Sequence, residues 1–384
     1  MSKVVNELEL VEFVRAARAA GSPFEIVAGA TRRAVGKPMC DANGGELAVL
    51  DVSGLSGIVK YEPEELIVTA APATPLSEIN ATLAERGQRL GFDPADWSAL
   101  LKSNGVATLG GAVSCDASGS GRLRHGGARD SLLAFRAVNG LGESFRGGAK
   151  VVKNVTGFDL PKLVCGAYGT LCVLSELTFR VYPKGACSTT LCLADVTPQV
   201  GFAALRKVAR SALEPGGLAY LPASMMPGMG QGVALIKLEG ARVPLQEKIA
   251  LAHGLLGDGL HEIHEDLFAA IGCGEMFAEA EGDVWRVMIA ASDAPKVVEE
   301  LNARCWLGDW AGGVIWLAAQ PSQAGHVRAV AASVNGHAML LRATPQSRAS
   351  LGIFASQPPA LEALNRAVKA AFDPLSLFNP GRMT

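Results

Sequence analysis

Apolar residues recur at helical spacing near the N-terminus. Leu10, Phe13, Val14 and Ala17 fall on one face of a 3.6-residue period, and Gly21 follows the last of them. This pattern predicts an amphipathic helix that ends at the glycine.

Short apolar runs then alternate with helical patterns. Three runs predict strands, and Thr74-Pro75 opens a second helix that ends at Gly87. The alternation predicts a first subdomain rich in βαβ units. The three predicted strands are Phe24–Ala28, Leu47–Val52 and Leu66–Ala71.

A second, strand-rich subdomain is predicted between residues 88 and 183. Its strongest signal is a hairpin, in which Leu132–Val138 and Glu143–Arg146 flank the turn Asn139-Gly140-Leu141-Gly142. Pro183-Lys184-Gly185 then marks a domain boundary.

The pattern changes beyond residue 184, where strands alternate with helical stretches and predict an α+β cap domain. We therefore expect a first domain over 1–183, a cap over 184–371, and a segment over 372–384 that returns to the first domain. No internal repeat is visible in the sequence. The predicted strands are Val233–Leu238, Trp285–Ile289 and Val314–Leu317, and the helical stretches lie near 198–212, 243–256 and 294–303.

Charge and hydropathy exclude several classes of protein. Lys and Arg number 35 against 37 Asp and Glu, which gives a net charge of −2 and no basic surface for nucleic acid. No run of eighteen apolar residues predicts a membrane span, and residues 1–7 lack the basic flank and apolar stretch of a signal peptide. We expect a cytoplasmic protein that reaches a membrane only through partner subunits.

A glycine loop follows the first predicted strand. Gly29-Ala30-Thr31-Arg32-Arg33 places free backbone N–H groups beside two cations, which suits a phosphate. The alternative is a solvated arginine pair at a surface turn. Neither the Gly-x-Gly-x-x-Gly fingerprint of nicotinamide dinucleotide sites nor a P-loop is present.

Three further glycine-bearing segments follow in the chain. Gly166 and Gly169 end a short helix that Asp159 caps, and they precede a buried strand. This turn either brings backbone close to a ligand or only joins a helix to a strand. The segments are Thr108–Ser114 with 118–121 and 124–130 behind it, Lys153–Leu163 running into Gly166–Leu174, and Phe372–Arg382.

Cysteine and histidine spacing predicts no metal site. The eight cysteines form no Cys-x-x-Cys pair, which argues against an iron–sulfur or zinc site, and Cys165, Cys172 and Cys192 read as core residues. His261 and His264 stand at i, i+3 on a segment of helical spacing beside acidic residues, but a third ligand in register is absent.

The order of the motifs resembles that of the FAD-binding proteins of the vanillyl-alcohol oxidase (PCMH) type, and within them the FAD-binding E subunits of bacterial glycolate oxidases. The resemblance covers residues 24–183 and 372–382 and ends with Phe-Asn-Pro-Gly-Arg. It implies an α+β fold, with a PCMH-type FAD-binding domain of two α/β subdomains followed by the α+β cap, and FAD as the cofactor.

The resemblance also implies which positions contact FAD. Four should meet the pyrophosphate, six the diphosphate and flavin edge, and three the adenosine half, while Pro94 should approach the isoalloxazine ring. His125 should either pack on FAD or take part in the chemistry. The four pyrophosphate positions are Gly29, Ala30, Thr31 and Arg32. The six at the diphosphate and flavin edge are Thr108, Gly110, Gly111, Ser118, Gly119 and Gly126. The three at the adenosine half are Gly169, Thr170 and Val173.

Two positions depart from the family pattern. The first loop reads Gly29-Ala30-Thr31-Arg32 where the family usually has Gly-x-Gly, so Ala30 adds a methyl there, and Cys172 replaces the last glycine of Gly-Thr-Leu-Gly. Each narrows the space for the cofactor, so FAD occupancy is expected to be weaker than typical. Because the first loop offers neither histidine nor cysteine, the FAD should be bound non-covalently.

The function implied is that of an FAD-binding subunit of a glycolate (2-hydroxy acid) oxidase complex. Electrons would pass through flavin, in company with a catalytic FAD-binding subunit and an iron–sulfur subunit. Activity of this chain alone is not expected, since only unpaired candidates for a base and a carboxylate anchor stand out, among them His125, Arg124 and Arg129. Two alternatives stay open: a structural subunit with a degenerate flavin site, and a stand-alone FAD-dependent 2-hydroxy acid dehydrogenase.

Overall fold

The computed structural model describes residues 1–40, 45–149, 158–226, 228, 230–257 and 259–383. The chain forms two compact units, each discontinuous in sequence. The first unit comprises residues 1–117, 126–183 and 356–384, and the second comprises 118–125 and 184–355. Residues 118–125 thus leave the first unit to pack in the second.

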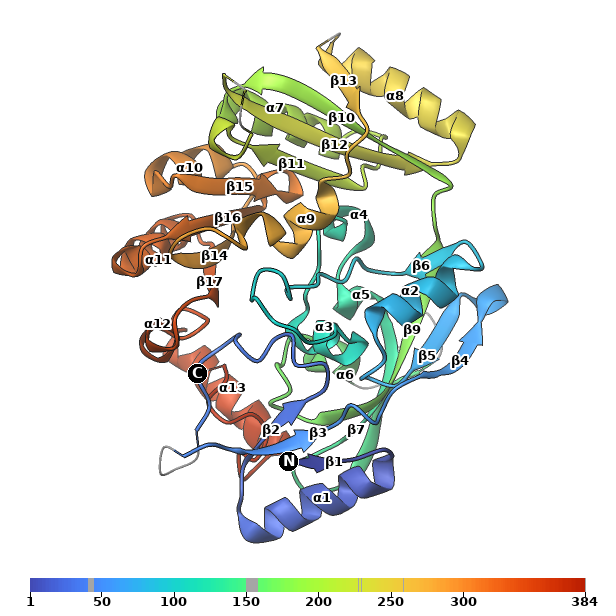
Figure 1. Cartoon of the computed structure of the whole chain (residues 1–384), viewed down its shortest axis with the longest axis vertical. Helices are drawn as coiled ribbons and strands as arrows, with labels where there is room; N and C mark the ends of the chain where they lie inside the picture. The colour runs from blue at the N-terminus through green and yellow to red at the C-terminus, as the bar shows by residue number, and fades with distance from the viewer. Residues whose placement is uncertain (41–44, 150–157, 227, 229, 258, 384) are drawn as a thin grey trace. The chain divides into compact units, whose positions relative to one another are not determined.

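A three-stranded parallel sheet opens the first unit, with strand order β1-β3-β2 (Figure 1). The predicted N-terminal helix is confirmed, because Asn6 caps its start and Gly21 ends it with φ 61°. Leu10 and Val14 of this helix are fully buried in one core with Phe24. The elements are β1 (Ser2–Lys3), α1 (Glu7–Ala20), β2 (Phe24–Val27) and β3 (Ala48–Asp51).

A second, antiparallel sheet completes this unit, with order β4-β5-β9-β7-β8 and with β6 paired to β9. The predicted hairpin is confirmed, since Val138 pairs with Ser144 across the turn. Its elements are β4 (Ile58–Glu62), β5 (Ile67–Ala70), β6 (Gln88–Leu90), β7 (Leu132–Val138), β8 (Ser144–Gly148) and β9 (Val173–Pro183), with α2 (Leu76–Ala84), α3 (Leu109–Cys115), α5 (Ala128–Ser131), α6 (Leu160–Val164) and the later α13 (Pro359–Phe372).

The second unit is built on an eight-stranded sheet of order β13-β10-β12-β11-β15-β16-β14-β17. Helices α7, α8, α10 and α11 bury their apolar faces against it in one core. The strands are β10 (Cys187–Val196), β11 (Gly217–Leu221), β12 (Gly232–Gly240), β13 (Leu260–Ile263), β14 (Asp283–Met288), β15 (Cys305–Asp309), β16 (Val314–Ala319) and β17 (His337–Arg342). The helices are α4 (Arg122–His125), α7 (Pro198–Ala209), α8 (Arg242–Leu256), α9 (Phe268–Cys273), α10 (Ala294–Leu301), α11 (Ala324–Ser333) and α12 (Pro345–Leu351).

This sheet repeats one topology twice. Both β10-α7-β11-β12-α8-β13 and β14-α10-β15-β16-α11-β17 run β-α-β-β-α-β, and each places its four strands in the order 4-1-3-2. The halves join where β11 pairs with β15 through Tyr220 and Gly308. The fold therefore contains a duplication that the sequence does not display, because core positions accept any apolar residue of suitable volume.

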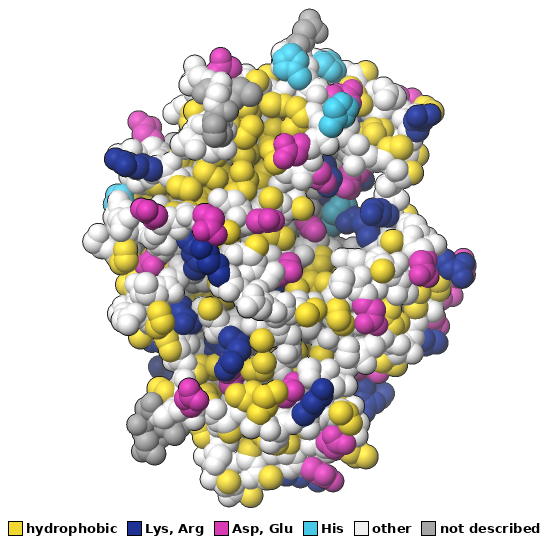
Figure 2. All heavy atoms as spheres, viewed as in Figure 1, with side chains coloured by type: hydrophobic (Ala, Val, Ile, Leu, Met, Phe, Trp, Pro, Cys, Tyr) yellow, Lys and Arg dark blue, Asp and Glu magenta, His cyan; other side chains and the backbone are white. Residues whose placement is uncertain are grey.

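The surface is mixed in charge. Lys and Arg side chains are interspersed with Asp and Glu on the face that Figure 2 displays, without a continuous basic area. Within the described ranges, no helix combines the length and the apolar character needed to cross a bilayer.

Candidate cofactor site

A cavity in the first unit is lined by residues from all four glycine-bearing segments. Its walls come from residues 26–33, 108–115 and 168–174, together with Val52, Pro72, Asn379 and Arg382. The stretch Lys153–Gly157 of the third motif lies outside the described residues. Segments far apart in the sequence thus meet at one place, as their shared glycine content predicted.

The first loop leaves β2 and turns sharply at Gly29 and Ala30. A Cβ on Gly29 would lie 1.6 Å from the carbonyl oxygen of Val106, whose N–H donates to Gly29 O at 2.8 Å. Position 29 therefore requires glycine because the backbone at Val106 packs against it. Ala30 adopts φ 61°, a left-handed conformation that favours glycine.

Arg32 carries the clearest signal of a missing ligand. Its side chain is 7% exposed, its Nη2 donates to Ala95 O, and its Cζ lies 5.2 Å from the centroid of the Trp97 ring. Its Nε and Nη1 are buried without a hydrogen-bond partner among the described residues. A buried guanidinium with unsatisfied donors is costly, so an anion in the cavity would satisfy it.

Two further arginines share a single carboxylate beside this loop. The Glu25 side chain, 6% exposed, accepts from Arg33 Nε at 3.1 Å and from Arg382 Nη2 at 2.9 Å. Hydrogen bonding to Glu25 raises the pKa of Arg33, whereas burial lowers the pKa of Arg382. Three arginines and no Asp or Glu lie among the described residues that line the cavity. The cavity therefore suits an anionic ligand such as a diphosphate, whose two charges would match the cationic excess.

Helix α3 forms a second wall. Thr108 caps it by accepting from Gly111 N at 3.3 Å. A Cβ on Gly111 would lie 3.1 Å from Arg32 Nη1, whereas one on Gly110 would lie 2.7 Å from the Pro72 side chain. Gly111 thus keeps room beside the buried guanidinium, and Gly110 allows close packing on Pro72.

The glycine turn forms a third wall. Asp159 caps α6 as predicted, and positive φ values follow at Gly166 (76°), Tyr168 (53°) and Gly169 (67°). The turn ends the helix, and Tyr168 and Gly169 also line the cavity. Cys172 also lines the cavity, and burial raises the pKa of its thiol to about 12, which keeps it neutral.

Nine of the fifteen positions predicted to contact FAD line this cavity, and six do not. Three of the six belong to the second unit, where Arg286 Nη2 donates to the Ser118 carbonyl, Trp310 Nε1 donates to the Gly119 carbonyl, and His125 Nε2 lies 3.9 Å from a carboxylate oxygen of Glu239. The nine positions that line the cavity are Gly29, Ala30, Thr31, Arg32, Thr108, Gly110, Gly111, Gly169 and Val173. The three positions that belong to the first unit but do not line the cavity are Pro94, Gly126 and Thr170.

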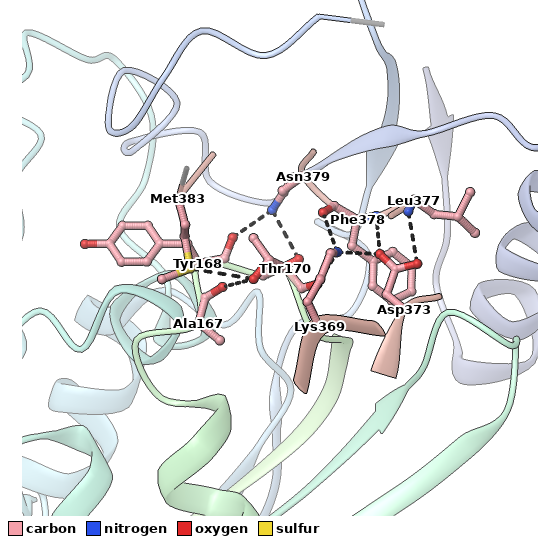
Figure 3. Close-up of polar contacts among 10 residues, drawn as sticks. Ala167, Tyr168, Thr170, Lys369, Asp373, Leu377, Phe378, Asn379 and Met383 are labelled. Carbon is pink, nitrogen blue, oxygen red and sulfur yellow. Dashed lines mark hydrogen bonds and ion pairs between the residues drawn. The ribbon is translucent and has the colours of Figure 1, made fainter. Parts of the chain in front are cut away.

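The sequence did not single out several residues of the cavity. Tyr168, Asn379 and Arg382 stood inside the quoted motifs but were assigned no role, and Cys115 followed one. Asn379 contacts the glycine turn (Figure 3). It also accepts a hydrogen bond from Ile26 N of β2. The sequence signal that could have singled out Asn379 is its position directly before Pro-Gly-Arg.

One predicted local structure is wrong. His261 lies in strand β13, paired with Cys192, and not on a helix, so the i, i+3 spacing to His264 does not bring the two rings to one face. Among the described residues no cluster of three or more His, Cys, Asp and Glu side chains could hold a metal ion.

Comparison with known proteins decides the family. Residues 3–148 match the model of the FAD binding domain family. The glycolate oxidase subunit GlcE of Escherichia coli K12 is 31% identical over 378 residues, which span 97% of this chain and 96% of that protein. The chain belongs to the GlcE family. The predicted family resemblance and FAD as the cofactor are thereby confirmed, as is membership of the FAD-linked oxidoreductases.

Other relatives of this GlcE family member are more distant. An uncharacterized FAD-linked oxidoreductase of Mycobacterium tuberculosis is 23% identical over 85% of this chain and 79% of its own length. The glycolate oxidase subunit GlcD of Bacillus subtilis is 28% identical over 40% of this chain and 30% of that protein.

Solved structures confirm the fold class of this GlcE family member. An alkyldihydroxyacetonephosphate synthase superposes with a TM-score of 0.71 at 13% identity, over 98% of this chain and 75% of that one. A p-cresol methylhydroxylase gives 0.71 at 14% identity, over 99% and 88%. At such identities the likeness establishes the α+β, PCMH-type fold alone.

Proposed function

We propose that the first unit holds one FAD non-covalently and that the chain is the FAD-binding subunit of a glycolate oxidase complex, which oxidises glycolate or another 2-hydroxy acid to the 2-oxo acid. The observation that carries the proposal is the buried Arg32 guanidinium, two of whose donors have no hydrogen-bond partner among the described residues. No Asp or Glu of the described residues lines the cavity. Membership of the GlcE family supports the proposal of a complex, because GlcE and GlcD are both named as glycolate oxidase subunits.

Different residues of the cavity would contact different parts of the cofactor. The loop Gly29–Arg32 and Gly111 would meet the diphosphate, and Gly169 and Val173 would border the adenosine half. When bound, FAD supplies the electron-accepting ring, and the protein orients it and tunes its potential. Cys172 stays a neutral thiol and contributes no charge to the wall. Pro94, Ser118, Gly119, His125, Gly126 and Thr170 stay predicted contacts.

The proposed partners would supply groups that we do not assign among the described residues of this chain. A hydroxy-acid dehydrogenase needs a proton acceptor and a carboxylate anchor held at the flavin face, and no such set is assigned among the described residues. We therefore infer that a catalytic FAD-binding subunit and an iron–sulfur subunit complete the reaction. The isolated chain should not oxidise glycolate at a useful rate.

Two measurements on the full chain test this proposal. Acid precipitation of the purified protein should leave a colourless pellet and a yellow supernatant, from which phosphodiesterase releases FMN. Dye reduction by glycolate should require the assembled subunits. A protein that stays colourless with added FAD, yet still joins the complex, would establish the structural alternative; rapid reduction of the isolated chain's flavin by glycolate would establish the stand-alone enzyme.

A further inference from the structure

The segment after α13 adds itself to the first parallel sheet. Phe24 N donates to Leu377 O at 2.8 Å, and Asn379 N donates to Phe24 O at 3.1 Å. Phe24 and Phe378 form a parallel β-bridge through their backbones, and the Phe378 side chain is fully buried. The segment therefore extends the edge that β2 presents beside the cavity.

A partly buried ion pair holds the start of this segment (Figure 3). Lys369 Nζ donates to Asp373 Oδ2 and to the Thr170 carbonyl, each at 2.5 Å. The Asp373 carboxylate, 0% exposed, accepts from the backbone N–H groups of Leu377 and Phe378 at 3.0 and 2.8 Å. One charged pair thus ties α13, the glycine turn and the returning segment together.

Asn379 uses its whole side-chain amide to join two walls of the cavity. Its Oδ1 accepts from Ile26 N at 2.9 Å, and its Nδ2 donates to Tyr168 O at 2.9 Å and Gly169 O at 3.4 Å. The residue is 3% exposed and adopts φ 41°, which asparagine tolerates better than most residues. A Cβ on Gly169 would lie 2.7 Å from Asn379 Nδ2, so the turn leaves no spare room for the amide to move.

We propose that Asn379 is a positioning residue for the cofactor, because it fixes the spacing between β2 and the turn 166–169, two backbone segments that line the cavity. The inference rests on the proposed function, in which FAD occupies that cavity. The amide also holds the carbonyl of Tyr168, a bulky residue in left-handed backbone that needs its surroundings to persist. Without Asn379 the two walls would lose this side-chain bridge, and cavity and ligand would fit less well.

Asn379→Asp tests this with almost no change of volume. The variant keeps the acceptor for Ile26 N–H but turns a second carboxylate oxygen toward two carbonyl oxygens. FAD should bind this variant about tenfold or more weakly in a titration of the full-length apoprotein, and the visible circular dichroism of the bound flavin should change at saturating FAD. Asn302→Asp is the matched control, since Asn302 also has left-handed backbone (φ 43°) but is exposed in the second unit.

Leu83→Ala separates positioning from mere stability. Leu83 is fully buried in the core of the first unit but does not line the cavity. This variant should unfold at a lower temperature and still bind FAD with the wild-type flavin spectrum. Should Asn379→Asp fail to fold, Lys369→Met is measured in its place, because it loosens the same segment without lining the cavity, and the same loss of affinity is expected.

The outcomes distinguish the two proposals. A wild-type protein that does not bind FAD contradicts the proposed function. A wild-type protein that binds FAD, alongside a folded Asn379→Asp variant whose affinity stays within about twofold and whose flavin spectrum is unchanged, contradicts the role of Asn379 alone.

Discussion

The guanidinium of Arg32 lies over the ring of Trp97, with Cζ 5.2 Å from the ring centroid, and both side chains are buried. Stacking holds the cation in place from one side and leaves Nε and Nη1 for a ligand. Because Trp97 lies directly behind the cation, its indole is a natural reporter of what the cation binds.

Arg32→Met should therefore weaken FAD binding by about 10- to 150-fold, since a hydrogen bond to a charged group contributes roughly 1.5–3 kcal/mol. The measurement is quenching of tryptophan fluorescence during FAD titration, with Trp97→Phe identifying the signal. Arg146→Met, at an exposed site on β8, should bind FAD normally. Equal affinities in the two arginine variants would show that Arg32 does not meet the cofactor.

Gly111→Val should abolish FAD retention while the fold survives. Its Cβ would lie 3.1 Å from Arg32 Nη1 and 3.2 Å from Thr108 Oγ1, so the branched side chain must displace the guanidinium or disturb the helix cap. Flavin absorbance per protein after gel filtration gives the result. Gly254→Val is the control, because nothing lies within 4 Å of a Cβ there. Full flavin content in Gly111→Val would mean that this glycine serves only the helix.

Ala30→Gly should stabilise the protein. Left-handed backbone costs a residue with a Cβ about 1–2 kcal/mol. The greater freedom of glycine in the unfolded chain reduces the gain in the free energy of unfolding by about 0.5–1 kcal/mol. With φ 61° at Ala30, the free energy of unfolding in urea should rise by about 0.5–1 kcal/mol, and FAD affinity should rise or stay constant. A variant less stable than the wild type would indicate that the alanine methyl makes a favourable contact.

Acid should remove one source of stability at the start of α1. Glu7 accepts hydrogen bonds from Arg136, Ser144 and Ser175, and the bond from Arg136 above all lowers the pKa of the Glu7 carboxyl to about 2. A lowered folded-state pKa stabilises the protein above the ordinary value of 4.5, and this stabilisation is lost as the pH falls from 4.5 toward 2.

The difference in Tm between wild type and Glu7→Gln should therefore be largest near neutral pH and vanish by about pH 2. Thermal scans across this range provide the measurement. Glu64→Gln, at an exposed carboxylate, serves as the control for general charge effects. A difference that stays constant down to pH 2 would contradict the lowered pKa.

Local patterns predicted much of the first unit, and contacts distant in sequence explain what they missed. The α1 stripe of Leu10 and Val14 and the turn that begins at Asn139 depend on neighbours in sequence, so they could be read directly. The need for glycine at position 29 comes from Val106, and the strand at His261 comes from pairing with β10. Neither partner is marked in the local sequence, because tertiary contacts override local spacing.

The cavity was predicted in part for the same reason. Arg32 and Gly111 stood out because cations and glycines near a predicted strand end suggest anion binding. Asn379 did not, since a single asparagine in a turn usually serves the turn itself. Its role becomes visible only when Ile26 and Tyr168 are seen to share it.

The hydrogen bond between Ile26 and Asn379 joins residues 353 positions apart, which sets an order of events during synthesis. At roughly 5–20 residues per second, a ribosome needs about 20–70 s to add the asparagine after the strand it completes. The first parallel sheet emerges early but stays open at one edge throughout translation of the second unit. On the proposed function, we therefore expect FAD to bind in its final geometry only after Asn379 has been synthesised.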